Sequence, residues 1–266
     1  MKTIPIFLVD SFAGEPFKGN PAGVVVLEKP ADAAWMQKVA MEMNQAETAF
    51  VVPLEKGFGL RWFTPTVEVD LCGHATLASA HILWKLHKVP KDQTISFETR
   101  SGWLHCTRQE QMIQLDFPAK VVEPCEEPEG LFAALGLMEG MIFFNKMDYL
   151  IVVPDETIVR LLKPNFAELF KLECRGVIVS AQSAANSSVD FVSRFFAPGS
   201  GIPEDPVTGS AHCAPGPYWA KVLGKNPLVG YQASPRGGYV HVEVKDDRVL
   251  LRGTAVTFLK GEMRRD

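Results

Sequence analysis

The stretch RWFTPTVEVDLCGHATLASA (residues 61–80) has a partial second copy in RFFAPGSGIPEDPVTGSAH (residues 194–212). Each copy holds an apolar strand ending at a proline, a loop with carboxylates, and a glycine that opens a run of small residues. The copies begin 133 residues apart, and their glycines, Gly73 and Gly209, are 136 residues apart. Two ordered matches at nearly one offset indicate a duplicated unit. A duplicated unit of this size predicts two related domains that face each other across a cleft.

The hydrophobic pattern around these copies predicts many short strands and a few helices. Apolar runs bounded by turn residues indicate strands, and apolar residues recurring every four positions from Trp35 to Met43 indicate a helix over 31–43. The small residues after Gly73 predict a buried helix over 73–88. Mostly strands with few helices favour an α+β fold over a doubly wound sheet. The other expected elements are strands at 4–9, 22–27, 48–52, 60–63, 94–99, 103–107, 111–117, 149–153, 176–180 and 189–196, helices at 155–162, 165–172 and from 209, and a hairpin of 239–244 and 248–258.

Length and composition are those of a soluble globular protein with room for two domains. The chain has 266 residues, 47% of them hydrophobic, and divides into predicted halves 1–119 and 120–266. A net charge of −4 argues against a nucleic-acid partner. The five cysteines form no CxxC pair, so neither a zinc ribbon nor a disulfide framework is expected. No apolar stretch reaches the ~20 residues that span a bilayer. We therefore expect a cytoplasmic protein without a membrane partner.

The two predicted glycine–helix junctions suggest a small anionic ligand. The first N–H groups of a helix have no partner within the helix, and the helix dipole adds partial positive charge there. A glycine at that point lets a ligand approach the backbone closely. Gly73 and Gly209, if they face each other, would suit a small carboxylate without any cofactor.

Short motifs from near the N-terminus to residue 224 follow an order typical of one family. They are GNPAGVV (19–25), NQAETAF (44–50), RWFTP (61–65), LCGHATLASA (71–80), EDPVTGSAH (204–212) and PYWAKVLG (217–224). With these motifs the chain resembles the phenazine-biosynthesis-like (PhzF) isomerase family. The resemblance implies the diaminopimelate-epimerase-like fold, in which two pseudo-symmetric β-rich domains each wrap around a central helix, here starting at Gly73 and at Gly209. It also implies a homodimer that needs no metal and no coenzyme.

The resemblance further implies three catalytic residues. Glu47, in the ETAF-type motif, would be the catalytic carboxylate, and its place between a helix and an apolar strand can raise its pKa into the range useful for proton transfer. His74 would line the same site and bond the substrate or donate a proton. Asp205 would hold an amino or hydroxyl group of the substrate and assist protonation. From the residues alone, plainer readings stay open: a surface charge for Glu47, a helix-cap residue for His74, and a turn or N-cap acid for Asp205.

The same resemblance implies how the substrate is held and what reaction it undergoes. Ser210, with the N–H groups of Gly73 and Gly209, would bind the substrate carboxylate, although Ser210 could also simply cap its helix. The hypothesis is an isomerase (EC 5) acting on a small unsaturated amino or hydroxy acid. Glu47 removes a proton from a carbon conjugated with the carboxylate and returns it elsewhere on the conjugated system, while the helix ends stabilise the developing charge.

Two other functions stay open at this point. Related families with this fold include epimerases that use two facing thiols, and Cys72 precedes the first glycine, where such a family has one catalytic cysteine. The pseudo-symmetric position is Thr208, and Cys213 lies one helical turn beyond Gly209, so a two-thiol mechanism is disfavoured. The second alternative is a binding protein that keeps the fold and has lost catalysis.

Two features predict that the halves are not equivalent. Pro215-Gly216 falls inside the second predicted helix, beyond its first turn, where proline costs about 3 kcal/mol or more. We therefore predict a kinked or interrupted second central helix. Arg175 falls roughly where a second-half partner of Glu47 would lie, so the glycines are duplicated and the proton-transfer group is not.

Overall fold

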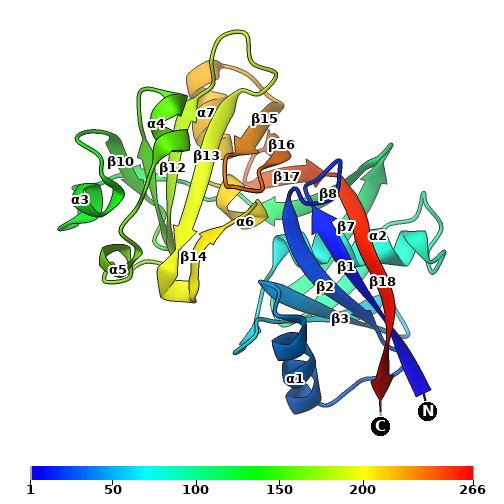
Figure 1. Ribbon diagram of the computed structural model, residues 1–266. Coiled ribbons are helices and arrows are strands. Elements are labelled where there is room, and N and C mark those ends of the chain that lie inside the picture. Colours follow the sequence, from blue (N-terminus) through cyan, green and yellow to red (C-terminus); the bar gives the residue numbers. More distant parts are fainter. Residues whose placement is uncertain (1, 266) are drawn as a thin grey trace. The chain divides into compact units, whose positions relative to one another are not determined.

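A computed structural model describes residues 2–265 and divides the chain into two units (Figure 1). Unit 1 comprises residues 1–116 and 252–266, and unit 2 comprises residues 117–251. The boundaries differ from the predicted halves 1–119 and 120–266, since the last residues of the chain belong to the first unit. The chain passes between the units twice, within β8 (Met112–Pro118) and within β17 (Arg248–Gly253).

Unit 1 is a mixed sheet around one buried helix. The first strand pairs antiparallel with the last strand of the chain and with the second strand. The second and third strands run parallel, and the fourth runs antiparallel to the third. The elements are β1 (Lys2–Ser11), β2 (Asn20–Val26), α1 (Ala33–Met43), β3 (Glu47–Pro53), β4 (Phe58–Phe63), β5 (Glu68–Val69), α2 (Gly73–Lys85), β6 (Ile95–Thr99), β7 (Gly102–Gln109) and β18 (Ala255–Arg265).

The helix α2 is the centre of unit 1. Every residue from Gly73 to Ala80 is buried, and the helix packs on β1, β2, β3 and β18. Small side chains permit this close approach, and the hydroxyl of Ser79 donates to the carbonyl oxygen of Ala75 (2.7 Å), so its polar atom is satisfied within the helix. The shorter helix α1 contributes Met36 to a separate apolar cluster that also includes Val25 and Phe50.

Unit 2 repeats this plan with more irregular elements. Strands β11 and β12 run parallel, β13 runs antiparallel to β12, and β13 and β15 run parallel. An apolar cluster that includes Leu131, Val159 and Phe196 forms one side of the core. The elements are β9 (Glu123–Pro124), α3 (Leu131–Leu135), β10 (Met141–Phe144), β11 (Asp148–Val152), α4 (Glu156–Leu161), α5 (Phe166–Leu169), β12 (Gly176–Gln182), β13 (Phe191–Ala197), the 3₁₀ turn η1 (Pro198–Ser200), β14 (Ile202–Asp205), α6 (Gly209–His212), α7 (Pro215–Leu223), β15 (Leu228–Gln232) and β16 (Gly238–Lys245).

The predicted interruption of the second central helix is confirmed. The segment is a single helical turn, α6, followed by the nine-residue helix α7. Pro215 is the first residue of α7, where its missing N–H costs no hydrogen bond and its fixed φ suits a helix start. Proline therefore starts a new helix here rather than bending an existing one.

The duplication is visible in a pair of matched ion pairs. Arg61 donates from Nε and Nη2 to the two carboxylate oxygens of Glu68, at 2.6 and 2.7 Å. In unit 2 Arg194 donates in the same way to Glu204, at 2.7 and 2.8 Å. Each arginine lies two residues before a matching phenylalanine of the copied motif, Phe63 or Phe196. Each pair ties a long strand to the short strand, β5 or β14, that precedes the central helix.

Most predicted strands and helices, and the α+β class, are confirmed. The predicted strand 248–258 is wrong as one element, because Thr254 separates β17 from β18 and donates from its hydroxyl to the carbonyl oxygen of Ala13 (2.8 Å). Short elements such as β5, β9, β10, α3 and β14 were not expected from the hydrophobic pattern. Within residues 2–265, no helix is long and apolar enough to cross a membrane.

The matched ion pairs allow a controlled stability test. The Arg194 and Glu204 side chains are 9% and 13% exposed, whereas Arg61 is 34% exposed. Glu204→Gln leaves a buried guanidinium without a counter-charge, so we expect it to lower the free energy of unfolding by about 3 kcal/mol. Glu68→Gln should cost about 1 kcal/mol or less, because Arg61 keeps its contact with water. Urea unfolding measures both, and an equal loss in the two variants would contradict this expectation.

Candidate active site

Glu47 and His74 lie side by side in unit 1. Glu47 is the first residue of β3, and His74 is the second residue of α2. Oε2 of Glu47 lies 3.2 Å from Nε2 of His74, and the two side chains are 13% and 5% exposed. The sequence motifs that contain them are 27 residues apart, and the packing of α2 under β3 brings them into contact.

The surroundings of His74 fix its charge and its tautomer. Burial lowers its pKa to about 3, so the ring is neutral at pH 7. The amide nitrogen of Asn20 lies 3.2 Å from Nδ1, and an amide N–H donates there only if Nδ1 carries no proton. The proton of the neutral ring is then on Nε2, which faces Glu47. The hydroxyl of Ser11 donates to the backbone carbonyl of His74 (2.8 Å) and holds this end of the helix in place.

Glu47, Cys72 and His74 also form a possible group of metal ligands, because each offers a donor atom within 4.8 Å of the others. Carboxylate, thiolate and imidazole are ligands that Zn²⁺ accepts. The contacts, however, divide between the two ring nitrogens: Sγ of Cys72 lies 3.5 Å from Nδ1, and Glu47 approaches Nε2. One ion binds only one ring nitrogen, so an ion held by these three residues would use either Nδ1 or Nε2 of His74.

The other sequence-predicted site residues lie in unit 2. Asp205, at the end of β14, is 7% exposed, and its carboxylate accepts a hydrogen bond from the hydroxyl of Thr208. Gln232 donates from Nε2 to the carbonyl oxygen of Asp205 (2.6 Å) and accepts from the N–H of Thr208 (2.8 Å). These bonds hold the loop that leads to Gly209. The structure thus joins Glu47 to His74 and, separately, Asp205 to the loop before α6.

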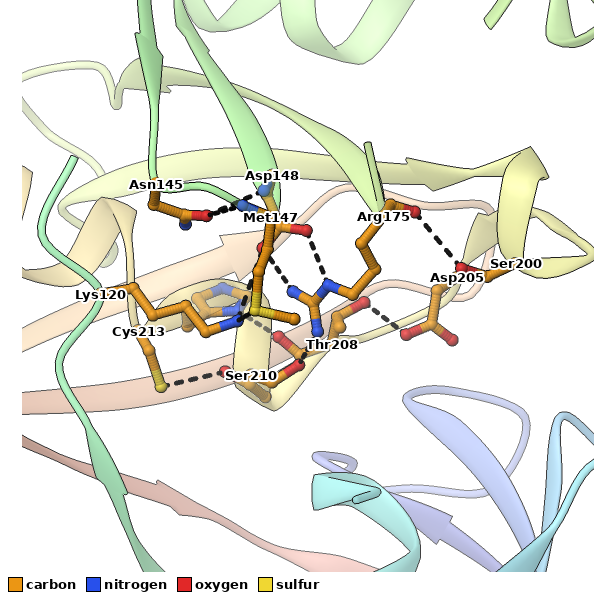
Figure 2. A network of polar contacts seen from close by, with 12 residues as sticks. Lys120, Asn145, Met147, Asp148, Arg175, Ser200, Asp205, Thr208, Ser210 and Cys213 are labelled. Carbon is orange, nitrogen blue, oxygen red and sulfur yellow. Dashed lines mark hydrogen bonds and ion pairs between the residues drawn. The ribbon is translucent and has the colours of Figure 1, made fainter. Parts of the chain in front are cut away.

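Sequence reasoning missed a polar cluster beside Ser210, which Figure 2 shows. The side chain of Arg175 donates to both carboxylate oxygens of the fully buried Asp148 and, from Nη1, to the hydroxyl of Ser210 (3.0 Å). Nζ of Lys120 lies 3.7 Å from the same carboxylate. A charged residue opening the apolar run DYLIV (148–152) was the one available signal, and it reads equally well as a strand boundary. Asn20, inside the motif at 19–25, was also overlooked.

The strand registers locate the counterpart of Glu47. Thr48 pairs with Phe63 in unit 1, and Val177 pairs with the matching Phe196 in unit 2, so Glu47 corresponds to Gly176. A Cβ atom at Gly176 would lie 2.5 Å from the ring of Phe195 and 2.9 Å from the carbonyl oxygen of Phe196. Unit 2 therefore has no room for a second carboxylate there. Arg175, one residue earlier, instead reaches Ser210, which occupies the place of His74 in the copied motif.

The protonation state of His74 can be tested directly. We expect its ring to stay neutral, with the proton on Nε2, from pH 8 down to about pH 4, because burial opposes the charged form. Nitrogen-15 NMR of labelled histidine measures this, and the spectrum of His74→Gln assigns the signal. An unfolded histidine takes up its proton near pH 6.5. The unfolded chain then binds more protons below that pH, so this residue should lower stability as pH falls, by up to about 1.4 kcal/mol per pH unit.

An inflection of the His74 signal near pH 6.5 would contradict this environment. So would a proton on Nδ1, because Asn20 then could not donate to that nitrogen.

Known proteins resemble this chain over its whole length. A model of the family described as phenazine biosynthesis-like protein matches residues 9–261. An uncharacterised isomerase of Halalkalibacterium halodurans is 49% identical, with 99% of each chain covered. The crystal structure of a phenazine biosynthesis protein of the PhzF family from Enterococcus faecalis has a TM-score of 0.95 and 45% identity, and covers 99% of this chain and 100% of that one. A hydroxyproline epimerase from Agrobacterium vitis shares the fold alone, with a TM-score of 0.62 and 10% identity over 98% of this chain and 92% of that one.

Proposed function

This chain belongs to the phenazine biosynthesis-like (PhzF) family, and on that premise we propose that it is an isomerase in which Glu47 moves a proton on a small unsaturated carboxylic acid. The observation that carries the proposal is the 3.2 Å contact between Glu47 and a neutral, buried His74. A neutral imidazole lying against one carboxylate oxygen does not neutralise the charge of the base. The carboxylate of Glu47 is the group that takes up the substrate proton.

The proposed reaction needs one group that both takes and gives a proton. Ionised Glu47 removes a proton from a carbon whose carbanion is delocalised into the conjugated system and the carboxylate. Glu47, now protonated, returns that proton to another carbon of the system. The double bond shifts, and the atomic composition and oxidation state of the substrate are unchanged. His74 stabilises Glu47 in its ionised form at both ends of the cycle.

Substrate binding extends the proposal to the second unit. We propose that the N–H groups at Gly73 and Gly209 and the hydroxyl of Ser210 hold the substrate carboxylate, and that Asp205 holds an amino or hydroxyl group. Because α6 is a single turn, the contacts at Gly209 would come from its local N–H groups rather than from the dipole of a long helix.

Solvent exchange tests the proton transfer. The protein is incubated in D₂O with a panel of small unsaturated amino and hydroxy acids, and deuterium incorporation and double-bond position are followed by NMR. We expect Glu47→Gln to lower the rate by a factor of about 10² to 10⁴, as for loss of a general acid–base group. Glu98→Gln, an exposed glutamate of β6 in the same unit, is the matched control and should keep the wild-type rate. A Glu47→Gln enzyme with the wild-type rate would show that the base is another residue.

The same assay separates the alternatives. Cys213 is buried, and burial raises its pKa to about 12, so at neutral pH it is a thiol rather than the thiolate that a two-thiol epimerase needs. Cys72→Ser should therefore retain most of the activity, and a large loss would favour the thiol mechanism. If no acid in the panel exchanges with the wild type, a binding protein of the same fold becomes the better assignment.

A homodimeric, cytoplasmic protein is also proposed, on the family premise alone. The chain has a mass of 29.4 kDa, so light scattering on the purified protein should give twice that mass. The monomer mass at all concentrations tested would contradict the dimer.

A further inference from the structure

The cluster of Lys120, Asp148 and Arg175 in unit 2 carries more positive than negative charge. Asp148 is fully buried, and both of its oxygens accept hydrogen bonds from Arg175. Lys120 is the second cation on this one carboxylate, and its side chain is 20% exposed. Two cations beside one anion leave an excess of one positive charge in a partly desolvated place. This excess charge raises the free energy of the folded protein unless another anion is present.

The hydrogen bonds of the cluster show which N–H groups remain available. Nη1 of Arg175 carries two hydrogens and donates one of them to Ser210. Nζ of Lys120 carries three, and among the described residues its partners are the Asp148 oxygen at 3.7 Å and the sulfur of Met147 at 3.5 Å, a weak acceptor. Figure 2 shows both side chains converging on Asp148 beside Ser210.

Asp148 keeps Arg175 in one orientation. Its backbone is held by Asn145, whose side-chain oxygen accepts from the N–H of Asp148 (2.8 Å), and the guanidinium lies over the ring of Phe195 at 5.4 Å. A guanidinium fixed on one edge by a buried carboxylate and on one face by an aromatic ring presents its remaining edge in a defined direction. Burial, followed by the neighbouring Arg175 guanidinium, lowers the pKa of Lys120, and the carboxylate of Asp148 opposes this shift.

We propose that Arg175 and Lys120, positioned by Asp148, form a binding site for a small carboxylate, with Ser210 as an additional hydrogen-bond partner. The ligand class follows from the donor set: a planar guanidinium edge and an ammonium match a carboxylate, and the excess charge of one matches a single carboxylate group. The proposal rests on the proposed function in taking the carboxylate of the isomerase substrate as the natural ligand. It makes Arg175 a specificity-determining residue that favours acids over their amides and esters.

Binding of sorbate, a conjugated monocarboxylate, tests the site without requiring turnover. Isothermal titration calorimetry on the full chain compares sorbate with sorbamide, which has the same carbon skeleton and no charge. We expect sorbate to bind at least about tenfold more tightly, corresponding to one charge-assisted contact of about 1.4 kcal/mol. Equal binding of the two compounds, or no binding of sorbate to the wild type at ~20 mM, would overturn the proposal.

Variants locate the sorbate in unit 2. Lys120→Met should weaken sorbate binding by about fivefold, and Lys171→Met, which removes an exposed lysine paired with Glu168, should change it by less than about twofold. Arg175→Gln alone would strand a buried Asp148, so it is combined with Asp148→Asn, which removes both charges together; this pair should weaken binding by about tenfold or more. Thermal unfolding of each variant confirms that it is folded. Wild-type sorbate affinity in the folded double variant would overturn the proposal.

Glu47→Gln separates this inference from the proposed reaction. Because Glu47 lies in unit 1 and is not part of the cluster, we expect this variant to bind sorbate as the wild type does, even though its exchange rate is strongly lowered. Sorbate binding with no exchange of any acid by the wild type would leave the carboxylate site standing and reject the isomerase. Loss of sorbate binding in Glu47→Gln would place the ligand elsewhere and overturn the carboxylate site.

Discussion

The burial of α2 is the constraint on which the structure of unit 1 depends. A helix surrounded by strands must satisfy its polar groups internally or from neighbouring side chains. Ser79 does the first, and His74 obtains its partners from Ser11 and Asn20 of the flanking strands. The same burial that excludes water from the helix start keeps the imidazole neutral and sets it against Glu47. Packing, charge state and the candidate chemistry therefore have one common cause.

The two units share a strand and helix arrangement and differ in the charged side chains at the start of the central helix. Matched arginine–glutamate pairs hold the loops before both central helices. At the helix start, unit 1 sets a carboxylate against a histidine, and unit 2 sets a guanidinium against a serine. In unit 2 the ring of Phe195 and the carbonyl oxygen of Phe196 occupy the space that a side chain at Gly176 would need. These opposite charges fit the proposal that unit 1 moves a proton and unit 2 binds an anion.

Sequence reasoning was strongest where a residue type has one structural use. The copied motif predicted both central helix starts, and Pro215 predicted the interruption of the second one. Sequence reasoning failed where interacting residues are distant in the chain. The residues next to Lys120 and next to Asp148 give no indication that these two side chains belong to one charged cluster. The contact between Glu47 and His74 could be expected only through the family resemblance. The tautomer of His74 could not be predicted at all, since it depends on Asn20 from another strand.

The pairing of β18 with β1 has a consequence for how the chain is made. The first and last strands lie together in unit 1 (Figure 1), so the whole of unit 2 is inserted between the penultimate and final strands of its neighbour. On the ribosome, unit 2 has all of its residues available while the sheet of unit 1 still lacks its closing strand. The edge of β1 that pairs with β18 stays unpaired until β18 has been made, and unpaired strand edges are where chains associate wrongly. The sheet of unit 1 is therefore completed by a strand that is made after all of unit 2.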